Sequence, residues 1–264
     1  MQIISVINQK GGVGKTTTVI NLAAGLSQHN KKILVIDLDP QGNATTGLGL
    51  SNMDNSSDTI YGVLNGTKEI YQVIKKTQFE NLDLVTSNVD LSGLEVETAD
   101  DTNRAFILKR KLVAYLNDSR GSYDYILIDC PPSLSLLTVM ALVCSGSLLV
   151  PLQTEFFALE GLTQLMKTIE RIKVNLNPEL KIRGILLTMY DKRNKLSSQV
   201  EKEARDYFSE KVYSTVIPRN VRLSEAPSHG MPVLIYDKSC PGSKSYFSFT
   251  VEFINQETTI GSAA

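Results

Sequence analysis

The chain alternates between short runs that are apolar throughout and longer segments whose apolar residues recur at helical spacing. Continuous apolar runs are typical of parallel strands that are buried on both faces. These runs occupy residues 3–7, 32–37, 82–86, 125–129, 147–151 and 182–188. Helical spacing is found in residues 15–28, 106–116 and 159–174. The alternation predicts an α/β fold, a single domain with a doubly wound and mostly parallel sheet.

A glycine-rich loop joins the first predicted strand to the first predicted helix. Its glycines leave backbone N–H groups free to point at one anion, and the positive end of the helix lies behind them. We expect Lys15 to place its charge on the β- and γ-phosphates of a nucleotide, and the hydroxyl of Thr16 to bind magnesium. The residues expected at the nucleotide are Lys10, Gly11, Gly12, Val13, Gly14, Lys15, Thr16 and Thr17.

The loop departs from the strict phosphate-loop pattern G-x-x-x-x-G-K-[ST], because Gln9 replaces its first glycine. The residue that follows is a second lysine, Lys10. A flexible cation at the loop entrance is badly placed to contact the phosphates of its own chain, but it could reach those of a second subunit across a two-fold axis. This position implies a homodimer that encloses the nucleotide, with Lys10 and Lys15 both in catalytic roles.

Residues 10–17, with the sequence KGGVGKTT, resemble the deviant Walker A loop of the ParA/MinD class of ATPases. The resemblance implies a P-loop NTPase fold of the deviant Walker A class. It also implies that ATP and Mg²⁺ are bound and that ADP is the product.

Acidic residues follow two of the predicted strands at their carboxyl ends, where open α/β sheets place their chemistry. Asp37 and Asp39 follow one strand, and both are expected to face the phosphates. Asp39 is our candidate for orienting the attacking water and for a place at the magnesium ion. Its D-x-D-P-Q-x-N stretch resembles a switch of the ParA family, although an aspartate before Pro40 is by itself equally typical of a turn. Asp129 ends another strand and is the candidate Walker B residue at the magnesium ion.

Two later segments resemble ParA proteins. Residues 151–162 are similar to the family pattern P-x-x-x-E-x-x-A-L-E-G-L, and we expect them near the dimer interface. Residues 213–230 resemble the chromosomal ParA proteins, often called Soj. That resemblance implies that Pro218 and Asn220 line the adenine. We interpret His229 as structural, because no other residue completes a nucleophile–base pair with it.

Composition limits the other possibilities. With 264 residues, of which 42% are hydrophobic, the chain can bury a substantial core. A net charge of −1 leaves any nucleic-acid binding to a local patch. Its three cysteines have no metal-binding spacing and predict free thiols. No apolar run is long enough to cross a bilayer, so we expect a cytoplasmic protein without a membrane partner.

The end of the chain is less regular. Residues 245–254 are richer in aromatic and β-branched residues than the helical C-terminus usual in the family, and we still expect a helix there. Residues 1–256 are expected to form the ATPase domain and residues 257–264 a frayed polar tail. For residues 59–64 and 70–74 the pattern leaves helix and strand equally open.

The resemblance implies an ATP-dependent, dimerising switch that drives chromosome or plasmid partition. Such a protein binds double-stranded DNA without sequence specificity, associates with the nucleoid and meets a ParB-like partner that stimulates its slow ATP hydrolysis. Arg193 and Arg222 match positions that the family uses for DNA, in two late basic loops that each follow a predicted strand of the sheet. If the two loops share a face, dimerisation would double the patch of phosphate contacts.

Three alternatives use a similar loop. A MinD-like membrane-associated division-site ATPase normally has a glycine where Gln9 stands and a basic amphipathic C-terminal helix, and both are missing. An iron–sulfur enzyme similar to the nitrogenase iron protein needs cluster cysteines, and Cys130 lies too near the phosphate site. A metabolic kinase needs a site for an acceptor substrate, and the sequence shows none.

Overall fold

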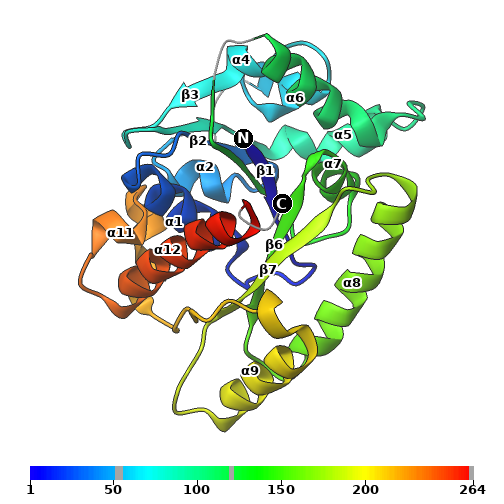
Figure 1. Cartoon of the computed structure of the whole chain (residues 1–264). Coiled ribbons are helices and arrows are strands. Elements are labelled where there is room, and N and C mark those ends of the chain that lie inside the picture. Colours follow the sequence, from blue (N-terminus) through cyan, green and yellow to red (C-terminus); the bar gives the residue numbers. More distant parts are fainter. Residues whose placement is uncertain (51–55, 119–121, 262–264) are drawn as a thin grey trace.

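The computed structural model describes residues 1–50, 56–118 and 122–261. Its centre is a seven-stranded sheet with the order β3-β4-β2-β5-β1-β6-β7 (Figure 1). Neighbouring strands are parallel except β3 and β4, which pair antiparallel. The strands are β1 (Gln2–Val6), β2 (Ile33–Asp37), β3 (Ile74–Lys76), β4 (Leu82–Val85), β5 (Tyr125–Asp129), β6 (Ser147–Gln153) and β7 (Lys181–Thr188). The six apolar runs predicted as strands are all present, and the mostly parallel sheet is confirmed.

Helices connect the strands. The α-helices are α1 (Lys15–Gln28), α2 (Asn43–Gly47), α3 (Ile60–Leu64), α4 (Ile70–Val73), α5 (Leu94–Glu97), α6 (Ile107–Asn117), α7 (Leu136–Cys144), α8 (Ala158–Asn175), α9 (Lys195–Phe208), α10 (Val221–Glu225), α11 (Val233–Tyr236) and α12 (Pro241–Gly261). Short 3-10 helices are η1 (Ser56–Asp58), η2 (Val89–Gly93), η3 (Arg104–Phe106), η4 (Ser209–Lys211) and η5 (Ala226–His229). The predicted helices correspond to α1, α6, α8 and α12. The two ambiguous segments become α3 in one case and α4 followed by β3 in the other.

Side chains of the central strands alternate between two buried faces. On β5, Tyr125 and Leu127 belong to the cluster that includes α1 and α12. Ile126 and Ile128 point the other way and join α3, α6 and α7. Helices α8 and α9 cover the same face farther along the sheet, where they pack against residues of β6 and β7. Helices therefore cover both faces of the sheet, which is the doubly wound arrangement that the apolar strands predict.

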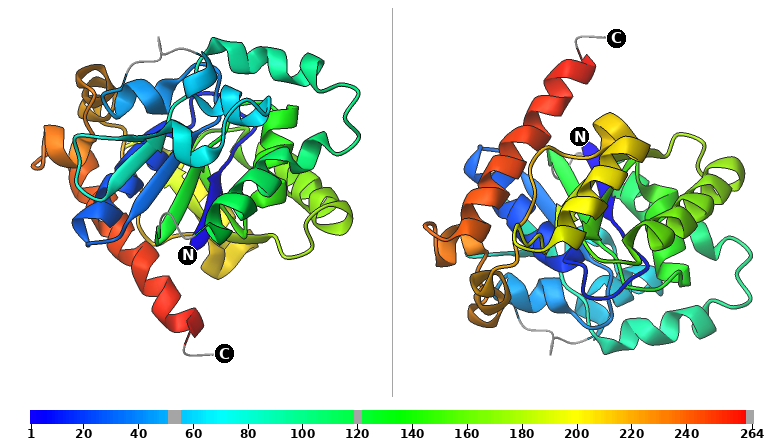
Figure 2. Two further views of the ribbon diagram at one scale, coloured as in Figure 1. Left: turned by 90° about the horizontal axis from the view of Figure 1, so that it is seen from above. Right: turned by 90° about the horizontal axis from the view of Figure 1, so that it is seen from below.

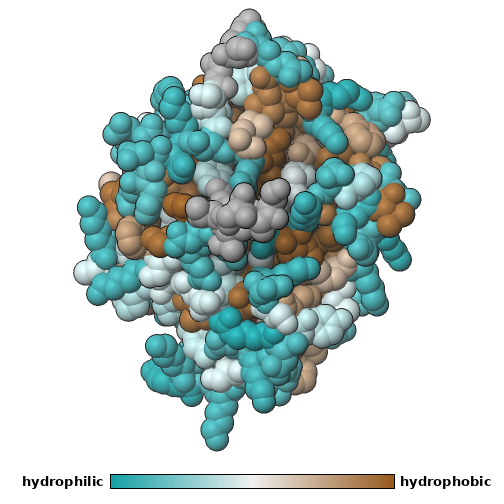
Figure 3. All heavy atoms as spheres, viewed as in Figure 1, coloured by the Kyte–Doolittle hydropathy of each residue, from teal (hydrophilic) through white to brown (hydrophobic). Residues whose placement is uncertain are grey.

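Two of the longer helices of the described chain, α7 and α9, are not predicted from the sequence. Helix α7 is buried along nearly its whole length, so it lacks the polar face that would reveal a helical period. Helix α9 is the opposite case, because it buries only Ser197, Val200 and Ala204. Hydrophilic residues cover the lower part of the molecule over α9 (Figure 3). These three positions nevertheless follow helical spacing, so the helical period is present in the sequence and the sequence analysis missed it.

The aromatic C-terminal segment is the helix α12, as expected. Tyr246, Phe249 and Phe253 recur at helical spacing and are fully buried in the cluster shared with α1. The two helices approach closely at Gly25, where an added Cβ would lie 2.2 Å from the hydroxyl oxygen of Thr250. The aromatic residues therefore form an apolar stripe on a helix, and the β-branched character of the segment does not make it a strand.

Helix α12 continues to Gly261, past the expected domain end at residue 256. Its last turns extend beyond the body of the molecule (Figure 2). Of the tail expected at residues 257–264, residues 262–264 lie outside the described residues. Within the described ranges, no helix combines the length and the apolar character that crossing a membrane requires.

The carboxyl ends of the central strands meet at one edge of the sheet. Asp37 at the end of β2 is the register partner of Asp129 at the end of β5, and Val6 at the end of β1 also pairs with Asp129. The glycine-rich loop after β1 and the acids after β2 and β5 therefore meet at the same edge, as the sequence predicts.

Candidate nucleotide-binding site

A cleft of about 610 Å³ lies at this edge of the sheet, which is within the usual size of small-molecule sites. One end is formed by the glycine-rich loop and the start of α1, and the other by the segment that leads into α10. The lining residues are Gly11, Gly12, Gly14, Lys15, Thr16, Thr17, Ile20, Asp39, Gln41, Asn43, Thr46, Gly47, Pro132, Thr188, Met189, Ile217, Pro218, Arg219, Asn220, Leu223, Ser224, Pro227, Ser228 and Tyr246.

The glycine-rich loop is shaped by two backbone positions with positive φ. Gly12 has φ 74° and Gly14 has φ 90°, a region that side chains with a Cβ rarely adopt. Gly14 also caps α1, with no side chain accepting from the helix's first N–H groups and no acid in its first turn. Those N–H groups are therefore available to an anion in the cleft. Val13 is buried, and its carbonyl accepts a hydrogen bond of 2.8 Å from the Thr188 hydroxyl, which fixes the loop.

Lys15 lies in the wall of the cleft. Its side chain is buried, and its Nζ donates a hydrogen bond of 3.0 Å to the carbonyl oxygen of Lys10, across the base of the loop. Burial lowers the pKa of Lys15, while the nearby charge of Asp129 acts against this shift. An anion in the cleft would supply the charge partner that a desolvated ammonium group lacks.

Asp129 lies behind Thr16, whose hydroxyl donates to Asp129 Oδ2 at 2.7 Å. The other oxygen, Oδ1, is buried and has no hydrogen-bond partner in the described structure. Burial, and next the charge of Asp37, raise the pKa of Asp129 well above its usual value. This arrangement fits a magnesium ion with its bound waters. The waters would give the free carboxylate oxygen a hydrogen-bond donor, and the ion would balance the negative charge of the buried acids.

The two acids after β2 have different surroundings. Asp37 is fully buried and its Oδ2 accepts from the backbone N–H and the hydroxyl of Thr45, at 2.8 Å and 2.7 Å, so it holds the start of α2. Burial raises the pKa of Asp37 to about 6. Asp39 lines the cleft, and its Oδ1 accepts from the Gln41 N–H at 3.0 Å. The expectation that both acids face the phosphates is therefore wrong for Asp37, whose carboxylate is turned toward Thr45.

The far end of the cleft contains Pro218 and Asn220, as expected. Asn220 is the N-cap of α10, and its Oδ1 accepts from the Arg222 N–H at 3.1 Å. Tyr246 of α12 also lines the cleft, and its hydroxyl lies 3.1 Å from that of Thr18 in α1. The sequence analysis missed Tyr246, because one tyrosine among the aromatic residues of this segment gives no indication that its side chain lines the nucleotide cleft.

Lys10 is not among the lining residues of the cleft. Its Nζ forms an ion pair with the carboxylate of Glu155, which follows β6, and half of its side chain is exposed. The two lysines of the loop therefore point to different places, one into the cleft and one toward the surface.

Comparison with known proteins identifies the family. A family model described as an AAA domain matches residues 1–182. The chromosome partitioning protein ParA of Caulobacter vibrioides is 50% identical over 257 residues, which are 97% of this chain and 95% of that protein. The chromosome-partitioning ATPase Soj of Treponema pallidum is 47% identical over 251 residues, which are 95% of this chain and 96% of that protein. This chain belongs to the ParA/Soj family of chromosome-partitioning ATPases.

A solved structure shows that the fold is shared with a nucleotide-binding protein. Cobyrinic acid a,c-diamide synthase from Mycobacterium smegmatis, with bound ATP analogue and magnesium, has a TM-score of 0.80 and 34% sequence identity, and the match covers 95% of this chain and 93% of that one. The P-loop fold of the ATPase class is thereby confirmed. The near full-length match to ParA and Soj proteins supports the partition branch over the MinD-like alternative. The iron–sulfur alternative gains no support, since all three cysteines are buried and free.

The two candidate DNA contacts of this ParA/Soj-family chain lie in adjacent segments. Tyr190, which follows β7, donates its N–H to the Ile217 carbonyl at 3.0 Å, and Arg219 donates its N–H to the Tyr190 carbonyl at 3.1 Å. The loop with Arg193 and the segment before Arg222 are thus joined by backbone hydrogen bonds. One expectation is corrected: in the described chain the second segment forms only isolated bridges with its neighbour and is not a strand of the sheet.

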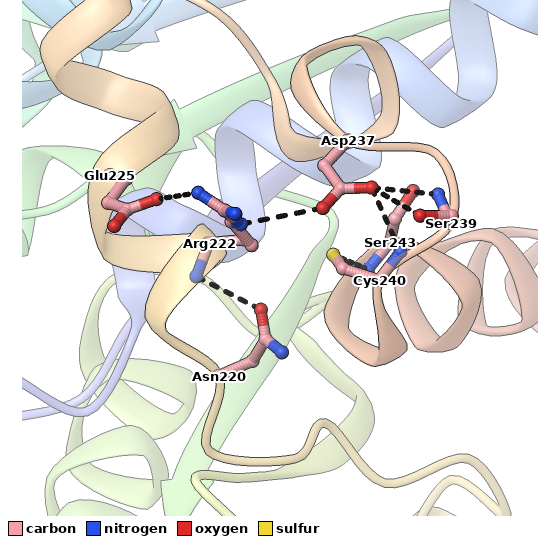
Figure 4. A network of polar contacts seen from close by, with 7 residues as sticks. All are labelled: Asn220, Arg222, Glu225, Asp237, Ser239, Cys240 and Ser243. Atoms are coloured by element: carbon pink, nitrogen blue, oxygen red, sulfur yellow. Dashed lines mark hydrogen bonds and ion pairs between the residues drawn. The ribbon is translucent and has the colours of Figure 1, made fainter.

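Both arginines already have acidic partners. Arg193 is almost fully exposed and donates to both carboxylate oxygens of Asp191, each at 3.1 Å. Arg222 donates to Glu225 at 2.6 Å and lies 3.5 Å from Asp237, in the network of Figure 4. These contacts hold the guanidinium groups in place at the surface, so DNA phosphates would have to compete with three carboxylates.

Proposed function

We propose that the chain is an ATP-dependent, dimerising switch that binds double-stranded DNA without sequence specificity and drives chromosome or plasmid partition with a ParB-like partner. Membership of the ParA/Soj family supports the partition role. The observation that carries the switch mechanism is the separation of the two loop lysines. Lys15 points into the cleft, whereas Lys10 is turned out of it, so the cleft of one subunit lacks a cation that a second subunit is able to supply.

The residues of the cleft divide the work of phosphoryl transfer. The N–H groups of the loop and the start of α1 hold the phosphates, and Lys15 places its charge on the β- and γ-phosphates. Thr16 and Asp129 would hold magnesium, which when bound neutralises charge on the phosphates. Asp39, which also lines the cleft, orients the attacking water. Pro218 and Asn220 hold the adenine, and ADP is the product.

The surface around Lys10 supports a second copy of this chain as its partner. Phe156 and Phe157, next to the Glu155 that pairs with Lys10, are 75% and 64% exposed, and their rings meet edge to face at 4.9 Å. Leu134, which follows β5 at the same sheet edge, is 43% exposed. Exposed aromatic residues beside a charged group are typical of the centre of a protein interface. A two-fold axis through this surface would bring each Lys10 toward the other cleft.

Lys10→Ala is expected to leave ATP binding by the monomer within about twofold of the parent and to prevent ATP-dependent dimerisation. The reason is that the Lys10 side chain pairs with Glu155 and does not line its own cleft. Molecular mass is measured by light scattering with ATP, with ADP and without nucleotide, and nucleotide affinity by fluorescence titration. Lys167→Ala removes an exposed lysine of α8 and serves as the control. A Lys10→Ala protein that dimerises with ATP as the parent does would contradict the cross-subunit role.

The double variant Arg193→Ala, Arg222→Ala is expected to weaken non-specific duplex binding and to flatten its salt dependence. Each lost phosphate contact should reduce the slope of log K against log[salt] by about 0.9. ATP hydrolysis without DNA should stay near the parent rate. Arg171→Ala, an exposed arginine on α8, is the matched control. If the double variant keeps the affinity and salt slope of the parent, the DNA-binding patch lies elsewhere.

A further inference from the structure

The ion pair between Lys10 and Glu155 joins two rigidly held backbone positions. The Lys10 N–H donates to Asn8 Oδ1 at 3.0 Å, and its carbonyl accepts from Lys15 Nζ at 3.0 Å. On the other side, the Glu155 N–H donates to the Gln153 carbonyl at 2.9 Å and the Glu155 carbonyl accepts from Ala158 at 3.0 Å, at the start of α8. Only the two side chains are able to move without breaking these bonds.

We propose that Glu155 is a positioning residue that holds the Lys10 ammonium group in the monomer, and that dimerisation exchanges this carboxylate for the phosphates of the partner's nucleotide. The proposal rests on the cross-subunit role of Lys10 given above. Lys10 has a single ammonium group, so it cannot pair fully with Glu155 and with a phosphate chain on another subunit at the same time. The ion pair therefore competes with dimer formation.

The exposure of the pair sets the size of the effect. The Lys10 side chain is 50% exposed and that of Glu155 is 28% exposed, while the Glu155 oxygen that faces Lys10 is itself buried, so water reaches the pair from the Lys10 side. Ion pairs of this kind contribute little, equivalent to a factor of about two to five in an equilibrium constant. A nucleotide carries several negative charges and so outcompetes one carboxylate. The pair is thus strong enough to bias the monomer and weak enough to be released when the partner's nucleotide arrives.

The ion pair lies next to the surface proposed as the dimer interface. Glu155 directly precedes the exposed Phe156 and Phe157, and its carboxylate is held at the surface only by Lys10 among the described contacts. When Lys10 leaves, the chain just before the aromatic pair loses this tie to the phosphate loop. The ion pair that is exchanged therefore lies directly beside the exposed aromatic surface.

Glu155→Gln tests the proposal, because glutamine keeps the size of the side chain and removes its charge. Dimerisation is measured by analytical ultracentrifugation over a range of protein concentrations with a non-hydrolysable ATP analogue. The dissociation constant of the dimer is expected to fall about four- to twenty-fivefold, because each of the two subunits releases one pair, while the affinity of the monomer for the analogue stays unchanged. Glu179→Gln is the control: it removes an exposed negative charge from the turn between α8 and β7, outside residues 151–162, and should leave the dimer unaffected.

Each result has a defined meaning. An unchanged dissociation constant in Glu155→Gln overturns the proposal, and so does a rise, which would place Glu155 among the contacts that stabilise the dimer. An equal fall in Glu155→Gln and Glu179→Gln also overturns it, since the effect would then reflect overall charge. Lys10→Ala is measured in parallel: if it dimerises like the parent, the cross-subunit role itself fails. If it stays monomeric while Glu155→Gln has no effect, that role stands and only the exchange fails.

Discussion

Lys15→Ala is expected to abolish productive nucleotide binding, with a loss of affinity of roughly a hundredfold or more. Lys15 is the cation whose ammonium group lies in the wall of the cleft, and burial makes its charge both costly and poorly screened. Removing it leaves the phosphates without their fixed charge partner and the Lys10 carbonyl without its donor. The measurement is a titration with a fluorescent ATP analogue in the presence of Mg²⁺.

Lys10→Ala is the matched control for Lys15→Ala, because it removes the same kind of side chain from the same loop. It should bind the analogue nearly as the parent does. Circular dichroism confirms that the Lys15→Ala protein is folded, which separates lost binding from lost structure. Equal losses of affinity in the two variants would show that the loop acts as a unit in the monomer and that the division of work between the lysines is wrong.

The strands and the glycine-rich loop of this site are predictable from the sequence, because burial and backbone geometry restrict which residue types can occupy them. Parallel strands buried on both faces must be apolar throughout, and the runs that become β1, β2 and β5 are visible for that reason. The glycine-rich loop is equally visible, since Gly12 and Gly14 adopt positive φ that few other residues tolerate. Where backbone geometry dictates the residue type, the residue type reveals the geometry.

Side-chain partners that are distant in the chain are not predictable in this way. Asp37 and Asp39 are two acids in the same short segment, yet the Asp37 carboxylate accepts a hydrogen bond from Thr45 and only Asp39 lines the cleft. The partner of Lys10 is Glu155, and nothing in the local sequence of either residue specifies the other. Such pairings depend on which loops the strand order brings together, which becomes visible only once the sheet is assembled.

The folded chain also suggests how nucleotide and DNA could be coupled. Asn220 lines the cleft and caps α10, while Arg222, two residues later, is the proposed DNA contact. Arg222 ties α10 to Asp237 before α12 (Figure 4). A nucleotide that fixes Asn220 would fix the first turn of α10 and with it the guanidinium group of Arg222. Base recognition and DNA contact would then share one short helix, a link that separate sequence motifs do not reveal.

The position of Asp39 gives it a role different from those of the phosphate-binding residues. Its Oδ1 accepts from the Gln41 N–H, while Oδ2 has no hydrogen-bond donor within the described chain. Asp39 comes from the loop after β2 and lines the same cleft as the glycine-rich loop, where a water that attacks the γ-phosphate of a bound nucleotide would arrive. One oxygen thus holds the turn, and the other is left to orient that water.

Asp39→Ala is expected to bind ATP and to form the dimer. Its rate of ATP hydrolysis should fall by roughly a hundredfold or more, because losing the group that orients the water raises the barrier without removing a phosphate contact. Asp39→Asn is the companion variant, since its amide oxygen is able to keep the bond to Gln41 while the charge is lost. ATP turnover is measured by phosphate release, and the dimer by size-exclusion chromatography with ATP. Both variants should persist as dimers long after the parent has returned to monomer. If both stay monomeric with ATP, Asp39 contributes to binding or to the magnesium site and does not orient the water.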